Sequence, residues 1–186
     1  MAGDRSGLIV LLLAGGEGRR IGGGKPARLL GGVSLLDRAL AKARSWSEDV
    51  RLVAREGGDL TDDPDIEGPL GGIAAGLRLG RPFLTIPCDM PFLPGDLAAR
   101  LRRDAPVTLA ASGGRVHPVC ALWRPDAAAA LPAYLATGRR SLTGFAQAAG
   151  CESVAWPVEP FDPFFNVNDE AELAQADRLL HIVGFM

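Results

Sequence analysis

The chain has 186 residues, 47% of them hydrophobic, so it is long enough to bury a core of its own without a partner. Its 20 Lys and Arg residues nearly balance its 22 Asp and Glu residues, so the overall charge gives no reason to expect binding to nucleic acid or to an anionic membrane. No apolar run approaches the roughly 20 residues that cross a bilayer. No linker, repeat or low-complexity segment divides the sequence, and we expect a single domain over residues 1–186.

The three cysteines, Cys88, Cys120 and Cys151, lie far apart in the sequence. Their spacing argues against a zinc knuckle, an iron–sulfur site and a disulfide framework, and it favours the reducing cytoplasm. The apolar run near the N-terminus is followed by Gly-Gly and Arg-Arg rather than by a small-residue cleavage site, so we expect no secretion signal.

Residues 8–14 form a continuous apolar run that ends at a pair of glycines. Such a run predicts a buried parallel strand, because a buried helix would need more length before the glycines. The next residues, 15–25, hold six of the 24 glycines together with Arg19, Arg20 and Lys25. Backbone N–H groups of such a loop can line an anion-binding concavity, so it predicts phosphate or nucleotide binding, the alternative being a flexible surface loop.

Spacing excludes the two commonest phosphate-binding glycine motifs. A P-loop would need Gly at position 19 and Ser or Thr at position 26, where Arg19 and Pro26 stand. The dinucleotide fingerprint would need a glycine where Ile21 stands. The loop must therefore belong to another class of nucleotide-binding protein if it binds a nucleotide at all.

The next segments predict alternating helices and strands. Gly31 and Gly32 indicate a turn, Ser34 is a candidate cap for a helix over residues 34–43, and residues 50–54 are typical of a strand. An acidic, turn-rich segment follows, and Gly68-Pro69 then opens another helix. This order predicts a parallel α/β sheet with its ligand at the carboxyl ends of the strands.

The stretch over residues 82–93 predicts an apolar strand that ends in Asp89, which lies between two prolines. A carboxylate at this end of a strand is a candidate ligand for Mg²⁺, which takes oxygen ligands and substrate phosphates. The alternative is that Asp89 caps the turn before a helix expected over residues 95–103.

In the second half of the chain we expect strands at residues 107–111 and 116–123, joined by a turn. A helix over residues 126–136 and another starting near Ser141 follow. Near the end, a strand that begins at Phe164 is expected to lead into a final helix capped by Asn168.

Several of these segments together resemble the molybdenum cofactor guanylyltransferase (MobA) family of nucleotidyltransferases. The matching motifs are Leu13-Ala14-Gly15-Gly16, Arg19-Arg20-Ile21-Gly22, Lys25, Gly68-Pro69-Leu70, Asp89, His117-Pro118, Arg139-Arg140 and Asn166-Val167-Asn168. The resemblance implies a single Rossmann-like three-layer α/β/α domain with a mostly parallel sheet, of the nucleotide-diphospho-sugar transferase type. It implies transfer of GMP from GTP to molybdopterin bearing molybdenum, with Mg²⁺ as cofactor and release of pyrophosphate.

The resemblance also implies roles for individual residues. Lys25 and Asp89 would be catalytic, with Asp89 as the metal ligand. The nucleotide would contact Leu13, Ala14, Gly15, Gly16, Arg20, Lys25, Asp63 and Asp89; in the acidic loop Asp63 is the best match, with Asp62 and Asp65 as alternatives. On the pterin side the candidates are His117, Arg139, Arg140, Asn166 and Asn168. Molybdoenzyme apoproteins or their chaperones would be transient partners.

The sequence departs from the family pattern in the strand over residues 50–54. The family commonly has an Asn in or just after this strand that contacts the nucleotide, whereas Val53, Ala54 and Arg55 stand here. Two alternatives stay open: a related nucleotidyltransferase that uses another base or acceptor, such as a cytidylyl or sugar-phosphate enzyme, and a nucleotide-binding regulator without catalytic activity.

Overall fold

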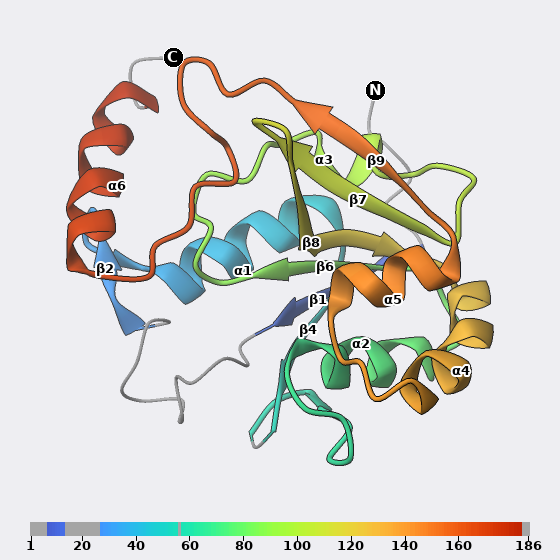
Figure 1. Ribbon diagram of the computed structural model, residues 1–186. Coiled ribbons are helices and arrows are strands. Elements are labelled where there is room, and N and C mark those ends of the chain that lie inside the picture. Colours follow the sequence, from blue (N-terminus) through green and yellow to red (C-terminus); the bar gives the residue numbers. More distant parts are fainter. Residues whose placement is uncertain (1–6, 14–26, 56, 184–186) are drawn as a thin grey trace.

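The computed structural model describes residues 7–13, 27–55 and 57–183, which are built around a seven-stranded β-sheet (Figure 1). The spatial order of its strands is β5-β4-β1-β6-β8-β7-β9. Strand β8 runs antiparallel to both of its neighbours, and every other neighbouring pair is parallel. The sheet consists of β1 (Ile9–Leu13), β4 (Asp49–Ala54), β5 (Leu60–Thr61), β6 (Phe83–Pro87), β7 (Val107–Ser112), β8 (Arg115–Trp123) and β9 (Cys151–Trp156).

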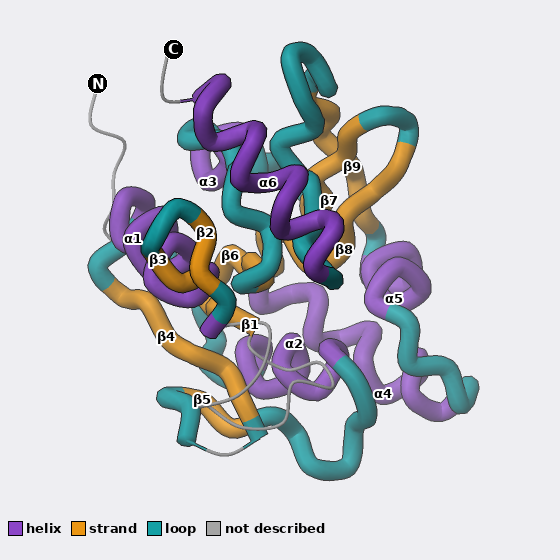
Figure 2. Tube along the Cα trace, turned by 90° about the vertical axis from the view of Figure 1, so that its left-hand side faces the viewer, coloured by secondary structure: helices purple, strands orange, loops and turns teal. Residues whose placement is uncertain are grey.

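Helices cover both faces of this sheet, as Figures 1 and 2 show. Val10 and Leu12 of β1 belong to a core cluster with α1 (Leu35–Trp46) and α3 (Leu97–Arg100). Ile9 and Leu11 point to the opposite face and share a cluster with α2 (Pro69–Leu77) and α5 (Leu142–Ala149). Because β1 is buried on both faces, every position in it is apolar, and the predicted strand and three-layer α/β/α arrangement are confirmed.

A small hairpin and the last helix pack together beside the main sheet. Strands β2 (Leu29–Leu30) and β3 (Val33–Ser34) are joined by Gly31 and Gly32, whose φ angles are +56° and +77°. These positive φ angles suit glycine, and the predicted turn is confirmed. Helix α6 (Glu170–Val183) lies against the hairpin: the Gly31 N–H donates to Asp177, and a Cβ on Gly31 would lie 2.8 Å from Leu180 Cδ1.

The helix starts follow local capping chemistry. The Asp37 N–H donates to Ser34 Oγ over 3.0 Å, which confirms Ser34 as the cap of α1. At α6, however, the cap is Asp169 and not the predicted Asn168. The Glu172 N–H donates to Asp169 Oδ1, and the Asp169 N–H donates back to Glu172 Oε2, which forms a capping box.

Three other element predictions differ from the structure. The helix expected over residues 95–103 is only the short α3. The helix expected over residues 126–136 is divided into a 3₁₀ segment, η2 (Pro125–Ala130), and α4 (Leu131–Ala136), because Pro132 has no N–H to continue an α-helix through this point. Residues 164–166 form no strand. Among the helices of the described residues, none has the length and apolarity needed to cross a membrane.

Candidate active site

Three parallel strands end side by side at one edge of the sheet. Leu13, the last residue of β1, pairs with Val53 of β4 and with Pro87, the last residue of β6. In open α/β sheets ligands bind outside these carboxyl ends. Asp89 follows Pro87 by two residues, so the acid expected to hold the metal lies at the same edge at which the glycine-rich segment follows β1.

Five of the residues expected to contact the nucleotide lie outside the described part of the chain. They are Ala14, Gly15, Gly16, Arg20 and Lys25. Leu13 is described, and its side chain is buried at the end of β1. The roles of the other five therefore remain predictions from the sequence.

Asp89 is half-buried and is joined through its backbone to the segment that precedes α6. Its carbonyl oxygen accepts a hydrogen bond from the Val167 N–H over 2.8 Å. Burial, and to a smaller extent the negative charge of Asp89, raises the pKa of the Cys120 thiol, so Cys120 stays protonated in the core. The hydrogen bond to Val167 brings Asn166 and Asn168 to the backbone of Asp89.

Asn166 carries a buried oxygen that lacks a donor. Its Oδ1 accepts no hydrogen bond within the described residues, while its Nδ2 donates to Asn168 Oδ1 over 3.1 Å. The Asn168 carbonyl in turn accepts from Arg28 Nη1. A buried acceptor without a partner costs about 1–3 kcal/mol, and a bound cation or hydrogen-bond donor would remove this cost.

The aspartates of the acidic loop after β5 differ in the contacts that they make. Asp63, the residue expected to contact the nucleotide, has its Oδ2 2.6 Å from Arg78 Nη1, and its Oδ1 accepts from the Asp65 N–H. The hydrogen bond from Arg78 is the main cause that lowers the pKa of Asp63. The carboxylate of Asp63 is thus already engaged by the protein, and Asp65 is exposed.

The side chain of Asp62 points away from that of Asp63 and toward Gly72. A Cβ placed on Gly72, in the first turns of α2, would lie 3.0 Å from Asp62 Oδ1 and 3.2 Å from Leu13 Cδ2. The Asp62 carboxylate therefore lies at the meeting point of α2 and the carboxyl end of β1. Burial raises the pKa of Asp62, and the positive charge of Arg55 opposes this rise.

His117 lies on β8 where the pairing with β7 is irregular. Leu109 pairs with Ala121 but Ala110 pairs with His117, so residues 118–120 stand between two consecutive pairs. The imidazole Nε2 is 2.7 Å from Ser112 Oγ, and the ring stacks on Phe164 at 4.6 Å between centroids. Burial lowers the pKa of His117, so the ring is neutral near pH 7 and is fixed in place by its neighbours.

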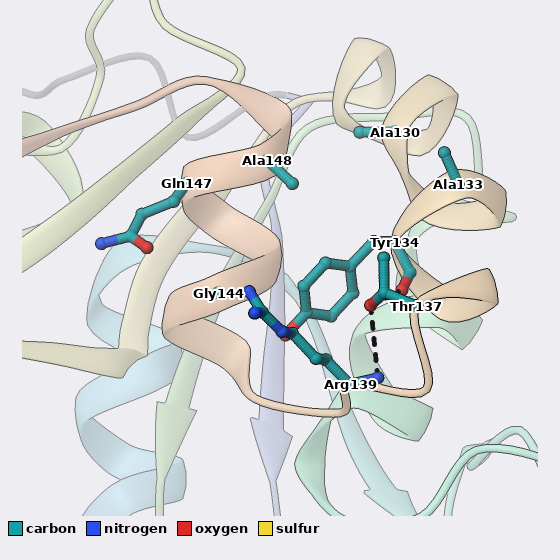
Figure 3. A pocket seen from close by; sticks show the side chains of 8 residues that line it. All are labelled: Ala130, Ala133, Tyr134, Thr137, Arg139, Gly144, Gln147 and Ala148. Carbon is teal, nitrogen blue, oxygen red and sulfur yellow. Dashed lines mark hydrogen bonds between the residues drawn. The ribbon is translucent and has the colours of Figure 1, made fainter.

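The two adjacent arginines lie in the turn between α4 and α5. Arg140 Nη1 donates to the Leu135 carbonyl at the end of α4 and to the Arg139 carbonyl. Arg139 lines an open groove of about 580 Å³ between the two helices (Figure 3). The groove is lined only by residues 130–148, and none of its lining residues comes from the strand ends near Asp89.

The residues at this edge suit a hard cation. In the described residues no group of three His, Cys, Asp or Glu side chains lies close enough together to hold a metal. Mg²⁺ does not need such a group, because it is usually held by one or two protein oxygens together with substrate phosphates and water. The Asp89 carboxylate and the buried Asn166 Oδ1 are oxygen donors of this kind, and Val167 links their backbones.

Sequence reasoning did not foresee the contacts of Arg28 or the position of Arg55 next to Asp62. Arg28 supports the Asn166–Asn168 turn through the Asn168 carbonyl and through an ion pair with Glu170. Arg55 directly follows β4, so it lies at the edge of the sheet where ligands bind. Its place after a predicted strand was the only feature of the sequence that could have indicated this position.

The arrangement of strands, with an acid and an amide at their carboxyl ends, is that of a nucleotide-binding α/β domain. A family model described as "MobA-like NTP transferase domain" matches residues 10–149. The molybdenum cofactor guanylyltransferase of Bradyrhizobium sp. (strain ORS 278) is 40% identical over 198 residues, which cover 91% of this chain and 91% of the relative. The chain belongs to the MobA-like NTP transferase family, and it is a nucleotidyltransferase.

Solved structures agree with this assignment. The molybdopterin-guanine dinucleotide biosynthesis protein A of Archaeoglobus fulgidus superposes with a TM-score of 0.73 at 25% identity, covering 93% of this chain and 98% of that one. The 4-diphosphocytidyl-2C-methyl-D-erythritol synthase of Anaerococcus prevotii gives a TM-score of 0.74 at 13% identity, covering 96% of this chain and 97% of that one. The second similarity shows that the fold is shared with enzymes that carry other names.

Proposed function

We propose that this chain transfers the GMP group of GTP to the terminal phosphate of molybdopterin bearing molybdenum. The observation that carries the proposal is the position of Asp89 at the carboxyl end of β6, level with the end of β1 and linked to Asn166 through Val167. The resemblance of the whole chain to molybdenum cofactor guanylyltransferases supports the choice of substrates.

The reaction is an in-line displacement at the α-phosphorus of GTP. An oxygen of the acceptor phosphate forms a new bond to the α-phosphorus, the bond from this phosphorus to the bridging oxygen breaks, and pyrophosphate leaves with the electron pair. The acceptor phosphate is already ionised at neutral pH, so no general base is required. Catalysis then consists of positioning the two substrates and stabilising charge.

Asp89 and Asn166 are the residues that would hold Mg²⁺. When bound, this ion would offset the negative charge of the triphosphate. The Asp89 carboxylate supplies the charged ligand, and the Asn166 amide supplies the neutral oxygen that has no hydrogen-bond donor in the described structure. We propose from the sequence alone that Lys25, Arg20 and the backbone of Ala14, Gly15 and Gly16 bind the triphosphate.

For the residues expected on the pterin side, we propose roles that are consistent with their contacts in the structure. His117 forms a fixed wall of the edge, because its ring is held by Ser112 and Phe164. Arg140 already donates to carbonyl groups, which leaves Arg139 as the arginine of the pair that could bind a phosphate; because the groove that Arg139 lines includes no residue of the strand ends near Asp89, this phosphate would not be the one that attacks GTP. Asn168 supports Asn166. We further propose that the enzyme works in the cytoplasm and passes its product to molybdoenzyme apoproteins or their chaperones.

The test is pyrophosphate release from GTP in the presence of a molybdopterin source, with CTP and ATP in parallel. We expect turnover with GTP, and we expect Asp89→Ala to abolish it. Glu152→Gln is a matched control, because this exposed acid lies near the start of β9, at the opposite end of the strands. Turnover with CTP and none with GTP would contradict the choice of base, and near-normal activity of Asp89→Ala at saturating Mg²⁺ would remove Asp89 from the mechanism.

The metal site has a readout that is independent of turnover. Binding of Mn²⁺ to the enzyme with GTP, followed by electron paramagnetic resonance, should weaken in both Asp89→Ala and Asn166→Ala. Unchanged Mn²⁺ binding by the Asn166 variant would show that the buried oxygen serves another purpose.

A further inference from the structure

Arg28 lies on the segment that leads into β2, and its side chain contacts the turn over residues 166–168. Its Nη1 donates to the Asn168 carbonyl over 3.3 Å, and its Nη2 is 3.5 Å from Glu170 Oε1. The side chain of Arg28 is 28% exposed but that of Glu170 is 80% exposed, so solvent screens most of the ion pair. The hydrogen bond to the carbonyl is therefore the contact through which Arg28 can hold the turn.

The backbone of this turn is held at two consecutive residues. The Asn168 carbonyl accepts from Arg28, and the Asn168 N–H donates to Glu172 Oε2 near the start of α6. The Val167 N–H donates to the Asp89 carbonyl, and the Val167 side chain is fully buried in a cluster that it shares with β2 and α6. Contacts from the segment before β2, from α6 and from the residues that follow β6 therefore fix the backbone of the turn.

The Asn168 side chain in turn orients the amide of Asn166. Asn168 Oδ1 accepts from Asn166 Nδ2 over 3.1 Å, so the Asn166 oxygen points away from Asn168. A reversed amide would place the Asn166 oxygen against Asn168 Oδ1, and neither of these acceptors has a proton to share. The Asn166 Oδ1 is left buried, and it accepts no hydrogen bond within the described residues. This is the oxygen that is proposed to bind Mg²⁺.

We propose that Arg28 is a positioning residue for the metal site, an inference that rests on the proposed function. Arg28 fixes the Asn168 carbonyl, Asn168 orients the Asn166 amide, and the Asn166 oxygen then meets the cation without having to turn. A group that is held in place beforehand loses less freedom on binding, which strengthens the binding. Outer partners of metal ligands contribute about 10- to 100-fold to metal affinity, and because Arg28 acts through Asn168, we expect about tenfold.

A guanidinium near a triphosphate site could instead bind a phosphate directly. Arg28 lies three residues after Lys25, which is proposed from the sequence to bind the triphosphate. The two roles differ in their dependence on the metal. A direct contact strengthens GTP binding with or without a divalent cation, whereas positioning strengthens it only when the cation is present. The contacts of Arg28 with the Asn168 carbonyl and with Glu170 favour positioning.

The test measures the dissociation constant of GTP in EDTA and with saturating Mn²⁺. The ratio of the two constants gives the contribution of the metal to GTP binding. Arg28→Ala should lower this ratio about tenfold and leave the GTP affinity in EDTA unchanged. Arg28→Lys keeps a charged donor and should restore part of the loss. Arg38→Ala is the matched control, because the Arg38 guanidinium donates to the Leu30 carbonyl within the hairpin itself, and it should keep the wild-type ratio.

A double variant tests whether Arg28 acts through Asn166. Asn166→Ala should lower the ratio, because it removes the oxygen that Arg28 is proposed to position. Adding Arg28→Ala to this variant should then lower the ratio no further, since the two residues act on one ligand. Urea unfolding of every variant establishes that each is folded under the conditions of the binding measurements.

The outcomes separate the inference from the proposed function. If Arg28→Ala keeps the wild-type ratio, or weakens GTP binding equally in EDTA and in Mn²⁺, the positioning role is wrong and the guanylyl transfer stands. Additive effects of Arg28→Ala and Asn166→Ala, or an equal loss in Arg38→Ala, would also overturn the role of Arg28. A wild type that binds CTP and not GTP would overturn the proposed function, and the same ratio measured with CTP would still decide whether Arg28 positions the metal site.

Discussion

The substitution Gly76→Ala tests how closely α2 packs on the sheet. Gly76 lies in the last turn of the helix, and an ideal Cβ at this position would lie 2.6 Å from Leu11 Cδ1 and 2.7 Å from Phe83 Cζ. Carbon atoms in contact prefer about 3.5–4.0 Å. Leu11 and Phe83 are both fully buried on central strands, so neither can move away from the new methyl group without disturbing the core.

The expected effect is the difference of two opposing terms. Overpacking a core by a methyl group costs about 1–3 kcal/mol. Replacing glycine by alanine in a helix recovers up to about 1 kcal/mol. We therefore expect Gly76→Ala to lower the free energy of unfolding by about 1 kcal/mol, which corresponds to a fall in Tm of about 2–4 °C for a chain of this size.

Gly72→Ala, one turn earlier in α2, is the matched control, because the new methyl group there has more room. Its Cβ would lie 3.0–3.2 Å from Asp62, Val53 and Leu13 atoms, so displacements of a few tenths of an ångström suffice and the Asp62 side chain can supply them. We expect its stability to equal or slightly exceed that of the wild type. Urea unfolding of the three proteins checks this, and a Gly76→Ala variant as stable as the wild type would refute the packing argument.

Three further outcomes follow from local contacts. Ser34→Ala removes the acceptor of the Asp37 N–H and should lower the free energy of unfolding by about 1 kcal/mol in urea titrations. Burial lowers the folded-state pKa of His117 from the ordinary value of 6.5. The stability that the neutral ring contributes is therefore complete above about pH 6.5 and is lost as the pH falls toward the folded-state pKa. His117→Gln should remove this part of the pH dependence of the free energy of unfolding, measured by urea titrations at several pH values. Arg78→Ala breaks the ion pair with Asp63, but Arg78 is 58% exposed, so solvent screening should limit the loss to about 0.2–1 kcal/mol, and a loss above about 2 kcal/mol would contradict this.

The elements that sequence reasoning predicted well are those whose evidence is local. The apolar run at β1, the Ser34 cap and the Gly31-Gly32 turn depend on the properties of consecutive residues, and the structure confirms all three. The position of Asp89 at the ligand edge also followed, because a residue after a buried parallel strand must lie at the carboxyl end of the sheet.

The differences arise where the deciding contact comes from a distant segment. Asp62 and Asp63 are neighbours of the same type, and only Arg78 and Gly72 on α2 distinguish their directions. The strand expected at residues 164–166 does not form because the backbone there turns toward Asp89, with the Val167 N–H bonded to the Asp89 carbonyl instead of to a strand. Such choices are not encoded in a short window of sequence.

The hydrogen bond between Val167 and Asp89 also bears on how the enzyme matures in the cell. Asp89 emerges from the ribosome long before Val167, and the amide oxygen of Asn166 emerges only with it. A nascent chain can thus assemble β1, β4 and β6 while the acid proposed to hold the metal still lacks its neighbour. Competence for the proposed transfer reaction should then be acquired only after residues 166 and 167 have been synthesised and have folded back onto Asp89.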